Sequence, residues 1–318
     1  MTEGRTAMKT EDIRRILIAG GGMMGKNIAF VFTSKPEYMV SVYDMYEVDV
    51  REGIRKNTAE LVRRGIISAE ELEERLGRVS FTTDIDSPLV KEADLVVEAV
   101  YEDMDVKRAT FAKLEERCRA DAIFCTNSSV MSPTAISRDL EHKERFAGTH
   151  FWNPGHLIPL VEVVKSDFTS DETAQTVMEV LAAVGKKPVL CKKDVPGFIA
   201  NRMQHALWRE AISIVEHGIA DAETVDTAVK YSFGLRLPQL GPIENADMVG
   251  MDLTWNIHDY ILPYLEDSHE PSPLLAQLRK EGKQGFKTGE GFRKWTPEEA
   301  ERTSEDLNSY LIDMIYGK

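Results

Sequence analysis

His150 and Glu162 are the two residues whose types and spacing could together move a proton. His150 lies in the apolar run FAGTHF, and Glu162 lies in the run LVEVV, beyond the turn-forming stretch NPGHLIP. If the two runs are strands joined by this turn, their side chains come within reach of each other. The carboxylate would then fix the tautomer of the imidazole and stabilise the cation formed when histidine accepts a proton. Otherwise, a lone histidine in an apolar strand is more often a satisfied core residue.

A glycine-rich turn near the N-terminus could bind a dinucleotide. Gly20, Gly22 and Gly25 have the spacing GxGxxG between an apolar run and a helical pattern. The first glycine permits the tight turn, the second lets the backbone approach a pyrophosphate, and the third lets the helix pack close to the strand. Asp44 ends the next apolar run, where a carboxylate binds both ribose hydroxyls of NAD and repels the 2′-phosphate of NADP. The sequence therefore predicts NAD, against the alternative of a glycine turn with a chance aspartate.

The elements that must position these residues alternate along the first two thirds of the chain. We predict strands at 15–20, 39–44, 94–100, 122–129, 145–151 and 160–164, and helices at 23–34, 52–78 (two helices, the second capped by Ser68) and 106–118. This alternation is typical of a parallel, doubly wound α/β sheet of the Rossmann type. Such sheets bind ligands at the carboxyl ends of their strands, where we expect the stretch TNSS (126–129) as well as His150. A base at this edge suits hydride transfer to NAD, which requires removal of a hydroxyl proton.

Beyond the stretch KKDVPGF the pattern changes and becomes almost entirely helical. Helical patterns cover 199–218, 221–233 and 252–267. We therefore predict an NAD-binding domain at 12–195, which includes a charged helical arm at about 48–79, and an all-helical C-terminal domain at 196–318.

Composition excludes several other classes of protein. The formal net charge of −14 argues against a nucleic-acid partner. We expect no membrane span, because no run of eighteen apolar residues occurs, and the polar start lacks the apolar core of a secretory signal. The three cysteines form no CxxC pair, so we expect no metal site and no disulfide frame, and we predict a cytoplasmic location.

Taken in order, the motifs resemble those of the L-3-hydroxyacyl-CoA dehydrogenase family. The resemblance covers about residues 16–295 and rests on GGGMMG, VVEAVYEDMDVK, TNSS, GTHFWNP, LVEVV, VPGFIANR, GPIENADMVGMD and GFKTGEGF. It implies NAD-dependent interconversion of a 3-hydroxyacyl-CoA and a 3-oxoacyl-CoA. It also implies that the helical domain closes the active site on this small-molecule substrate and forms a homodimer.

The resemblance also implies roles for individual residues. His150 would be the general base and Glu162 its orienting partner, while Ser129 and Asn201 would hydrogen-bond the reacting oxygen. Positions implied to bind the cofactor are Gly20, Gly22, Met23, Met24, Gly25, Asp44, Glu102, Lys107, Asn127, Asn153 and Lys287. Glu102 and Lys107 would face the nicotinamide half of NAD, and the methionines would pack beneath the dinucleotide.

Each of these assignments has a structural alternative. Ser129 could be only a turn residue, and Asn201 only a helix cap. Glu102 and Lys107 could be a solvated pair on a helix.

The substrate is less firmly indicated than the chemistry. GHLIPL, CKKDVPGF and SFGLRLPQLGP depart from the acyl-CoA pattern and look more like relatives that act on small free acids, the gulonate, carnitine and pyridine-carboxylate dehydrogenases. His156, Arg202 or Arg236 could then meet a substrate carboxylate. The arm carries five cationic residues, Arg51, Arg55, Lys56, Arg63 and Arg64. They could bind the phosphates of CoA, or they could belong to a solvated helix face that neighbouring glutamates balance.

We therefore predict a 3-hydroxyacyl-CoA substrate, with a free hydroxy acid as the alternative. A third hypothesis is a non-catalytic NAD-binding structural protein, since one relative serves as a lens crystallin. The complete set of His150, Glu162, Ser129 and Asn201 argues against it.

Overall fold

The computed structural model describes residues 8–317 and divides into two units. The first unit comprises Met1–Ala200 and Ser309–Lys318, and the second comprises Asn201–Asn308. The predicted polar leader at the N-terminus lies partly outside the described residues.

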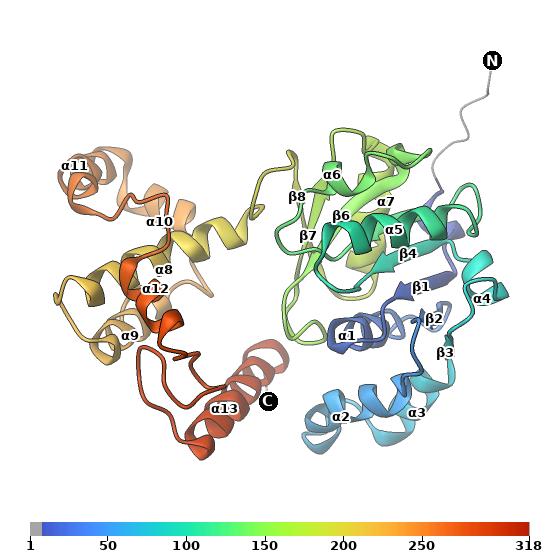
Figure 1. Ribbon diagram of the computed structural model, residues 1–318, viewed down its shortest axis with the longest axis horizontal. Helices are drawn as coiled ribbons and strands as arrows, with labels where there is room; N and C mark the ends of the chain where they lie inside the picture. The colour runs from blue at the N-terminus through green and yellow to red at the C-terminus, as the bar shows by residue number, and fades with distance from the viewer. Residues whose placement is uncertain (1–7, 318) are drawn as a thin grey trace. The chain divides into compact units, whose positions relative to one another are not determined.

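An eight-stranded sheet forms the centre of the first unit (Figure 1). Its order is β3-β2-β1-β4-β5-β6-β7-β8, and all neighbours pair in parallel except β6 and β7, which are antiparallel. The strands are β1 Arg15–Ala19, β2 Met39–Tyr43, β3 Val79–Thr82, β4 Leu95–Glu98, β5 Ile123–Thr126, β6 Phe146–Phe151, β7 Leu160–Lys165 and β8 Lys187–Cys191. The predicted Rossmann-type sheet is confirmed, with one reversal at β6–β7 where a fully parallel sheet was expected.

Successive residues of a strand point to opposite sides of the sheet, so strands made of consecutive apolar residues give the sheet two apolar faces. Helices cover both of these faces. On one face, Ile16 and Ile18 of β1 share a core with α1, α2, α3 and α7. On the other face, Leu17 and Ala19 pack with α4, α5 and α6. The helices of this unit are η1 Thr10–Asp12, α1 Met23–Phe32, α2 Val50–Arg63, α3 Ala69–Gly77, α4 Pro88–Lys91, α5 Met104–Glu115, α6 Pro133–Ser137, η2 Lys143–Arg145 and α7 Asp171–Ala183.

The charged arm forms two helices, as predicted. The side chain of Ser68 caps α3 by accepting a hydrogen bond from the amide of Glu71. Ile54 and Leu61 of α2 are 1% exposed, so the apolar side of this helix is buried in the core of the unit.

The second unit is helical, as the sequence predicted, apart from two isolated β-bridges, Gly285–Glu290 and Glu290–Lys294. Its elements are α8 Ala200–Glu216, α9 Ala222–Lys230, η3 Phe233–Leu235, α10 Pro242–Val249, α11 Met251–Ile261, η4 Leu262–Tyr264, α12 Pro273–Lys280 and α13 Pro297–Tyr316, of which Ser309 onward belongs to the first unit. Among residues 8–317, no helix combines the length and the apolar character needed to cross a lipid bilayer.

Candidate active site

His150 and Glu162 occupy directly opposed positions on β6 and β7. Opposed residues of an antiparallel pair project to the same face of the sheet, so their side chains meet. His150 Nδ1 lies 2.8 Å from Glu162 Oε2, and the two residues are 4% and 0% exposed. If Nδ1 carries the hydrogen and donates a hydrogen bond to Glu162, Nε2 is the ring nitrogen that can accept a proton.

Glu162 accepts several further hydrogen bonds. Its Oε2 accepts from Trp152 Nε1 at 3.2 Å, and its Oε1 accepts from the amides of Ile199 and Ala200, each at 2.9 Å. Burial acts to raise the pKa of Glu162, but the hydrogen bonds from His150, the two amides and Trp152 outweigh it and hold this pKa below its ordinary value. The carboxylate is therefore ionised at neutral pH and can balance an imidazolium.

A left-handed turn aims the two amides at Glu162. Gly197 has φ 76° and Phe198 has φ 50°, a conformation that non-glycine residues rarely adopt. Phe198 is 2% exposed, and the centroid of its ring lies 5.8 Å from that of His150. The sequence predicted only a break at VPGF, since nothing in it indicated that the turn serves a carboxylate.

The glycine loop has the geometry that a phosphate site needs. Gly20 has φ 115°, and a Cβ there would lie 2.5 Å from Ala99 O. A Cβ on Gly25 would lie 1.8 Å from Gly20 O, so the first turn of α1 can approach β1 only with glycine at this position. At Gly22, in contrast, a Cβ would meet no atom within 4 Å, and no side chain caps α1. The start of α1 thus leaves room for an anionic group at its positive end.

Asp44 joins β2 to this loop. Its Oδ2 accepts a hydrogen bond from Gly21 N at 2.7 Å, and its Oδ1 accepts from Tyr46 N at 3.0 Å. Met24 packs partly buried against the core, whereas Met23 is 59% exposed. The glycines and the fixed carboxylate together fit the phosphates and ribose of a dinucleotide.

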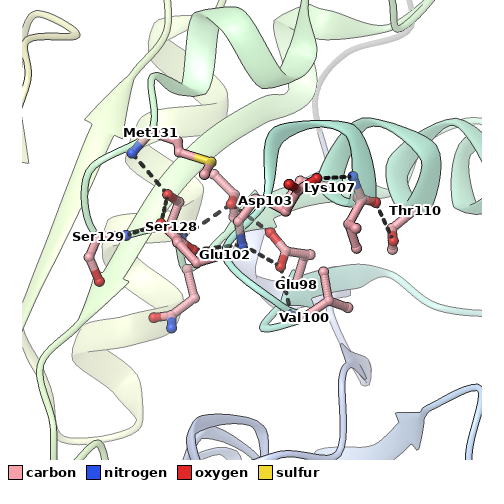
Figure 2. Close-up of polar contacts among 12 residues, drawn as sticks. Glu98, Val100, Glu102, Asp103, Lys107, Thr110, Ser128, Ser129 and Met131 are labelled. Atoms are coloured by element: carbon pink, nitrogen blue, oxygen red, sulfur yellow. Dashed lines mark hydrogen bonds and ion pairs between the residues drawn. The ribbon is translucent and has the colours of Figure 1, made fainter.

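Glu102 and Lys107 form an ion pair at the start of α5 (Figure 2). Lys107 Nζ lies 3.1 Å from Glu102 Oε2 and 2.8 Å from Glu98 Oε1. The Lys107 side chain is 1% exposed, whereas that of Glu102 is 40% exposed. The pair is therefore not a solvated one, and Glu102 is the member that a ligand can reach.

The segment after β5 brings further predicted residues to the same edge. Ser129 is exposed, and its amide donates to Glu102 Oε1 at 3.1 Å (Figure 2). Asn127 Oδ1 accepts from Phe151 N at 2.9 Å and so ties the end of β5 to the end of β6. Asn153 is exposed in the turn after β6. Asn201 and Lys287 belong to the second unit, and their roles stay predictions.

Two family models match most of the chain. The model described as 3-hydroxyacyl-CoA dehydrogenase, NAD binding domain, matches residues 15–195, and the C-terminal domain model of the same name matches residues 197–295. The chain belongs to the 3-hydroxyacyl-CoA dehydrogenase family. It is thus an NAD-dependent dehydrogenase that acts on a CH–OH group.

Individual relatives match over most of this chain. Human mitochondrial hydroxyacyl-coenzyme A dehydrogenase is 36% identical over 292 residues, which cover 89% of this chain and 91% of the relative. A crystal structure described as 5-formyl-3-hydroxy-2-methylpyridine 4-carboxylic acid 5-dehydrogenase, an NAD+-dependent dismutase, is 30% identical with a TM-score of 0.86, covering 96% and 99% of the two chains. The structure of 3-hydroxybutyryl-CoA dehydrogenase from Escherichia coli is 33% identical with a TM-score of 0.73, covering 89% and 60%.

The cations of the dehydrogenase's helical arm are engaged within the protein. Each of the five side chains contacts a carboxylate or a carbonyl of the first unit: Arg51 to Val79 O, Arg55 to Glu73 and Glu52, Lys56 to Glu52, Arg63 to Glu60, and Arg64 to Asp313 and Ser309 O. The side chains of Lys56 and Arg63 are nevertheless 75% and 76% exposed, so these surface pairs are compatible with both readings of the arm, the balanced face and the CoA phosphate patch.

His156 is a packing residue of the loop after β6. Burial first, and the nearby Lys186 ammonium second, lower the pKa of His156 to about 4. It is therefore neutral at physiological pH and provides no cation for a substrate carboxylate. Arg202 and Arg236 lie in the second unit.

Proposed function

We propose that the enzyme interconverts a 3-hydroxyacyl-CoA and a 3-oxoacyl-CoA, with His150 as the general base. The observation that carries this proposal is the 2.8 Å contact between His150 and the buried carboxylate of Glu162, on strands whose ends lie at the ligand-binding edge of a Rossmann-type sheet. Proton removal from a hydroxyl is the step for which such a pair is suited.

In the proposed mechanism the substrate hydroxyl donates to His150 Nε2, with Ser129 and Asn201 as further partners of the reacting oxygen. His150 takes the hydroxyl proton, and Glu162 balances the imidazolium that results. The imidazole of His150 keeps its orientation because Glu162 is itself held by hydrogen bonds from Trp152 and two backbone amides. Bound NAD supplies the acceptor for the hydride that leaves the substrate carbon.

We infer that NAD is held by Gly20, Gly22, Gly25 and Asp44 at its adenosine and phosphate end. Glu102, through its exposed carboxylate, suits a hydroxyl of the nicotinamide ribose. Met23, Met24, Asn127, Asn153 and Lys287 complete the proposed cofactor set, whereas the buried Lys107 takes part in it through its ion pair with Glu102.

A small free acid is the second candidate substrate. Two observations favour it: the arm's five cations are engaged within the protein, and the pyridine-carboxylate enzyme matches 96% of the chain with a TM-score of 0.86. The phosphates of a CoA thioester would compete with these surface carboxylates for the same cations.

The deciding experiment compares NADH formation from 3-hydroxybutyryl-CoA, free 3-hydroxybutyrate, gulonate and the pyridine carboxylate. The first proposal expects kcat/KM for the thioester to exceed that for every free acid by at least about tenfold, one step of 1.4 kcal/mol. A free acid that exceeds the thioester by that factor would establish the second candidate. No NADH from any of the four would contradict both.

We propose that the second unit forms a homodimer through α10 and α11. None of the residues of these helices is buried, and their exposed apolar side chains include Ile243, Met248, Met251, Leu253, Trp255, Ile257 and Tyr260. Trp255 is 72% exposed and Ile243 is 76% exposed, which is unusual for a helical domain that stands alone. A second copy of the chain is the partner that would cover them.

Substitution of Trp255 by Glu should convert the dimer to a monomer, because a charge would replace a large apolar contact. Light scattering should then report half the wild-type mass. Ile219→Glu, at a residue that is 74% exposed between α8 and α9, is the matched control and should leave the mass unchanged. A monomeric wild type would contradict the dimer proposal.

We also propose functional domains at 12–195 and 196–318, with residues 48–79 as an arm over the substrate. The end of α13, from Ser309 onward, packs with the first unit although it belongs to the second of these domains in sequence. We place the enzyme in the cytoplasm, since Cys118, Cys125 and Cys191 are free thiols.

A further inference from the structure

A buried carboxylate, Glu98, lies at the end of β4 and takes no part in the proton transfer described above. It is 0% exposed. Its Oε1 accepts from Val100 N at 2.7 Å and from Lys107 Nζ at 2.8 Å, and its Oε2 accepts from Thr126 Oγ1 at 2.7 Å. One carboxylate therefore joins the end of β4, the first turns of α5 and the end of β5.

These contacts close into a ring of polar groups, of which Figure 2 labels Glu98, Lys107, Glu102 and Ser128. From Glu98, Lys107 Nζ reaches Glu102 Oε2 at 3.1 Å. The hydroxyl of Ser128 donates to Glu102 Oε1, and the amide of Ser128 donates to Thr126 Oγ1 at 3.2 Å. Thr126 then returns to Glu98. Because the ring is closed, the position of each member depends on the others.

The ring has one accessible member at the cofactor edge. Glu102 has a side chain that is 40% exposed, whereas Lys107 is 1% and Thr126 is 1% exposed. Glu102 is also the group that accepts the amide of Ser129. Any change in the buried part of the ring thus reaches a ligand through Glu102.

Stability alone does not explain a charge at this position. Burial acts to raise the pKa of Glu98, and Lys107, Thr126 and Val100 oppose that shift without cancelling it. An apolar pair of similar volume would avoid this desolvation, and buried ion pairs are often no more stable than such replacements. The negative charge of Glu98 does, however, hold the Lys107 ammonium in position. Without Glu98, Lys107 would have only Glu102 as a carboxylate partner among its ion pairs.

We propose that Glu98 is a positioning residue for the cofactor: it holds Lys107 in place and so keeps the Glu102 carboxylate oriented toward the ribose of NAD. This inference rests on the proposed function in that Glu102 is taken as the cofactor contact. With Glu98 neutral, Lys107 would pair with Glu102 alone and weaken it as a hydrogen-bond acceptor.

The test is Glu98→Gln in the full-length enzyme, measured by NADH titration and by steady-state kinetics. We expect the Kd for NADH and the KM for NAD to rise about tenfold, since hydrogen bonds to charged groups carry roughly this factor or more. We expect kcat at saturating NAD to stay within about threefold, because His150 and Glu162 lie outside the ring. A merely structural role would lower kcat and the unfolding midpoint without this split.

Variants at Thr126 test the same ring without removing a charge. Thr126→Val deletes the donor to Glu98 Oε2 at nearly constant volume and should raise KM for NAD by about threefold to tenfold, whereas Thr126→Ser should restore it. Glu92→Gln removes a carboxylate that pairs with Arg15 at 3.5 Å, ahead of the same strand, and is the matched control with unchanged constants.

The outcomes separate this inference from the proposed function. NADH titration needs no substrate, so it reports on Glu98 even if every substrate in the panel fails. Kd for NADH within twofold of wild type in folded Glu98→Gln would overturn the inference. If that variant does not fold, unchanged binding in Thr126→Val would overturn it instead.

Discussion

His150→Asn should lower kcat by about 10²–10⁴, the range that a positioned general base contributes. Asparagine keeps a polar side chain on β6, but its amide is not basic. It therefore cannot take the hydroxyl proton and become a stable cation, as imidazole can. The change leaves Glu162 with its bonds from Trp152, Ile199 and Ala200, so the local fold should survive. The measurement is NADH formation at saturating substrate.

Two controls make this result specific. NADH binding should be unchanged in His150→Asn, because the glycine loop follows β1 and Asp44 follows β2, whereas His150 lies on β6. His142→Asn, at a partly exposed histidine ahead of η2, should turn over like the wild type. A His150→Asn enzyme that works at nearly the wild-type rate would remove His150 from the mechanism.

Gly25→Ala should destabilise the first unit by about 3 kcal/mol, as overpacking at a rigid site does. The added Cβ would lie 1.8 Å from Gly20 O, a backbone atom that cannot move without displacing the turn between β1 and α1. We expect a lower unfolding midpoint and a loss of NADH binding, measured by circular dichroism and by NADH titration.

Gly22→Ala is the matched variant for this prediction. Its Cβ would meet no atom within 4 Å, so the unfolding midpoint should fall only slightly. NADH binding should nevertheless weaken by at least about tenfold, since the methyl group would stand where the pyrophosphate approaches. Equal stability of the two variants would contradict the packing argument, and unchanged NADH binding in Gly22→Ala would contradict the phosphate assignment.

The sequence predicted the sheet because most strands are buried on both faces and therefore read as apolar runs. β4, with all four residues buried, is an example. β8 was missed since its residues KPVLC are mostly exposed at the sheet edge and its apolar run is only three residues long, Val189 to Cys191. β3 was missed for a similar reason, because only Val79 is fully buried in it. Edge strands carry a weaker pattern than central ones.

Pairs close in sequence could be predicted in the site, whereas its long-range supports could not. His150 and Glu162 were predicted together because a single turn separates their strands. Glu98 was read only as part of an apolar strand, since its partner Thr126 is 28 residues away and no periodicity connects them. The same holds for the amides of Ile199 and Ala200, which reach Glu162 from 37 and 38 residues away.

The dependence of kcat/KM on pH, compared between wild type and Glu162→Gln, tests the His150–Glu162 pair most directly. Hydrogen bonds hold the pKa of Glu162 below its ordinary value, so in the wild type the carboxylate is ionised at neutral pH and can stabilise an imidazolium on the adjacent ring. Glutamine cannot balance that cation. The acid limb should therefore move to lower pH by about one unit or more in the variant, with a lower plateau. An acid limb at the same pH in both enzymes would show that Glu162 does not act on the base.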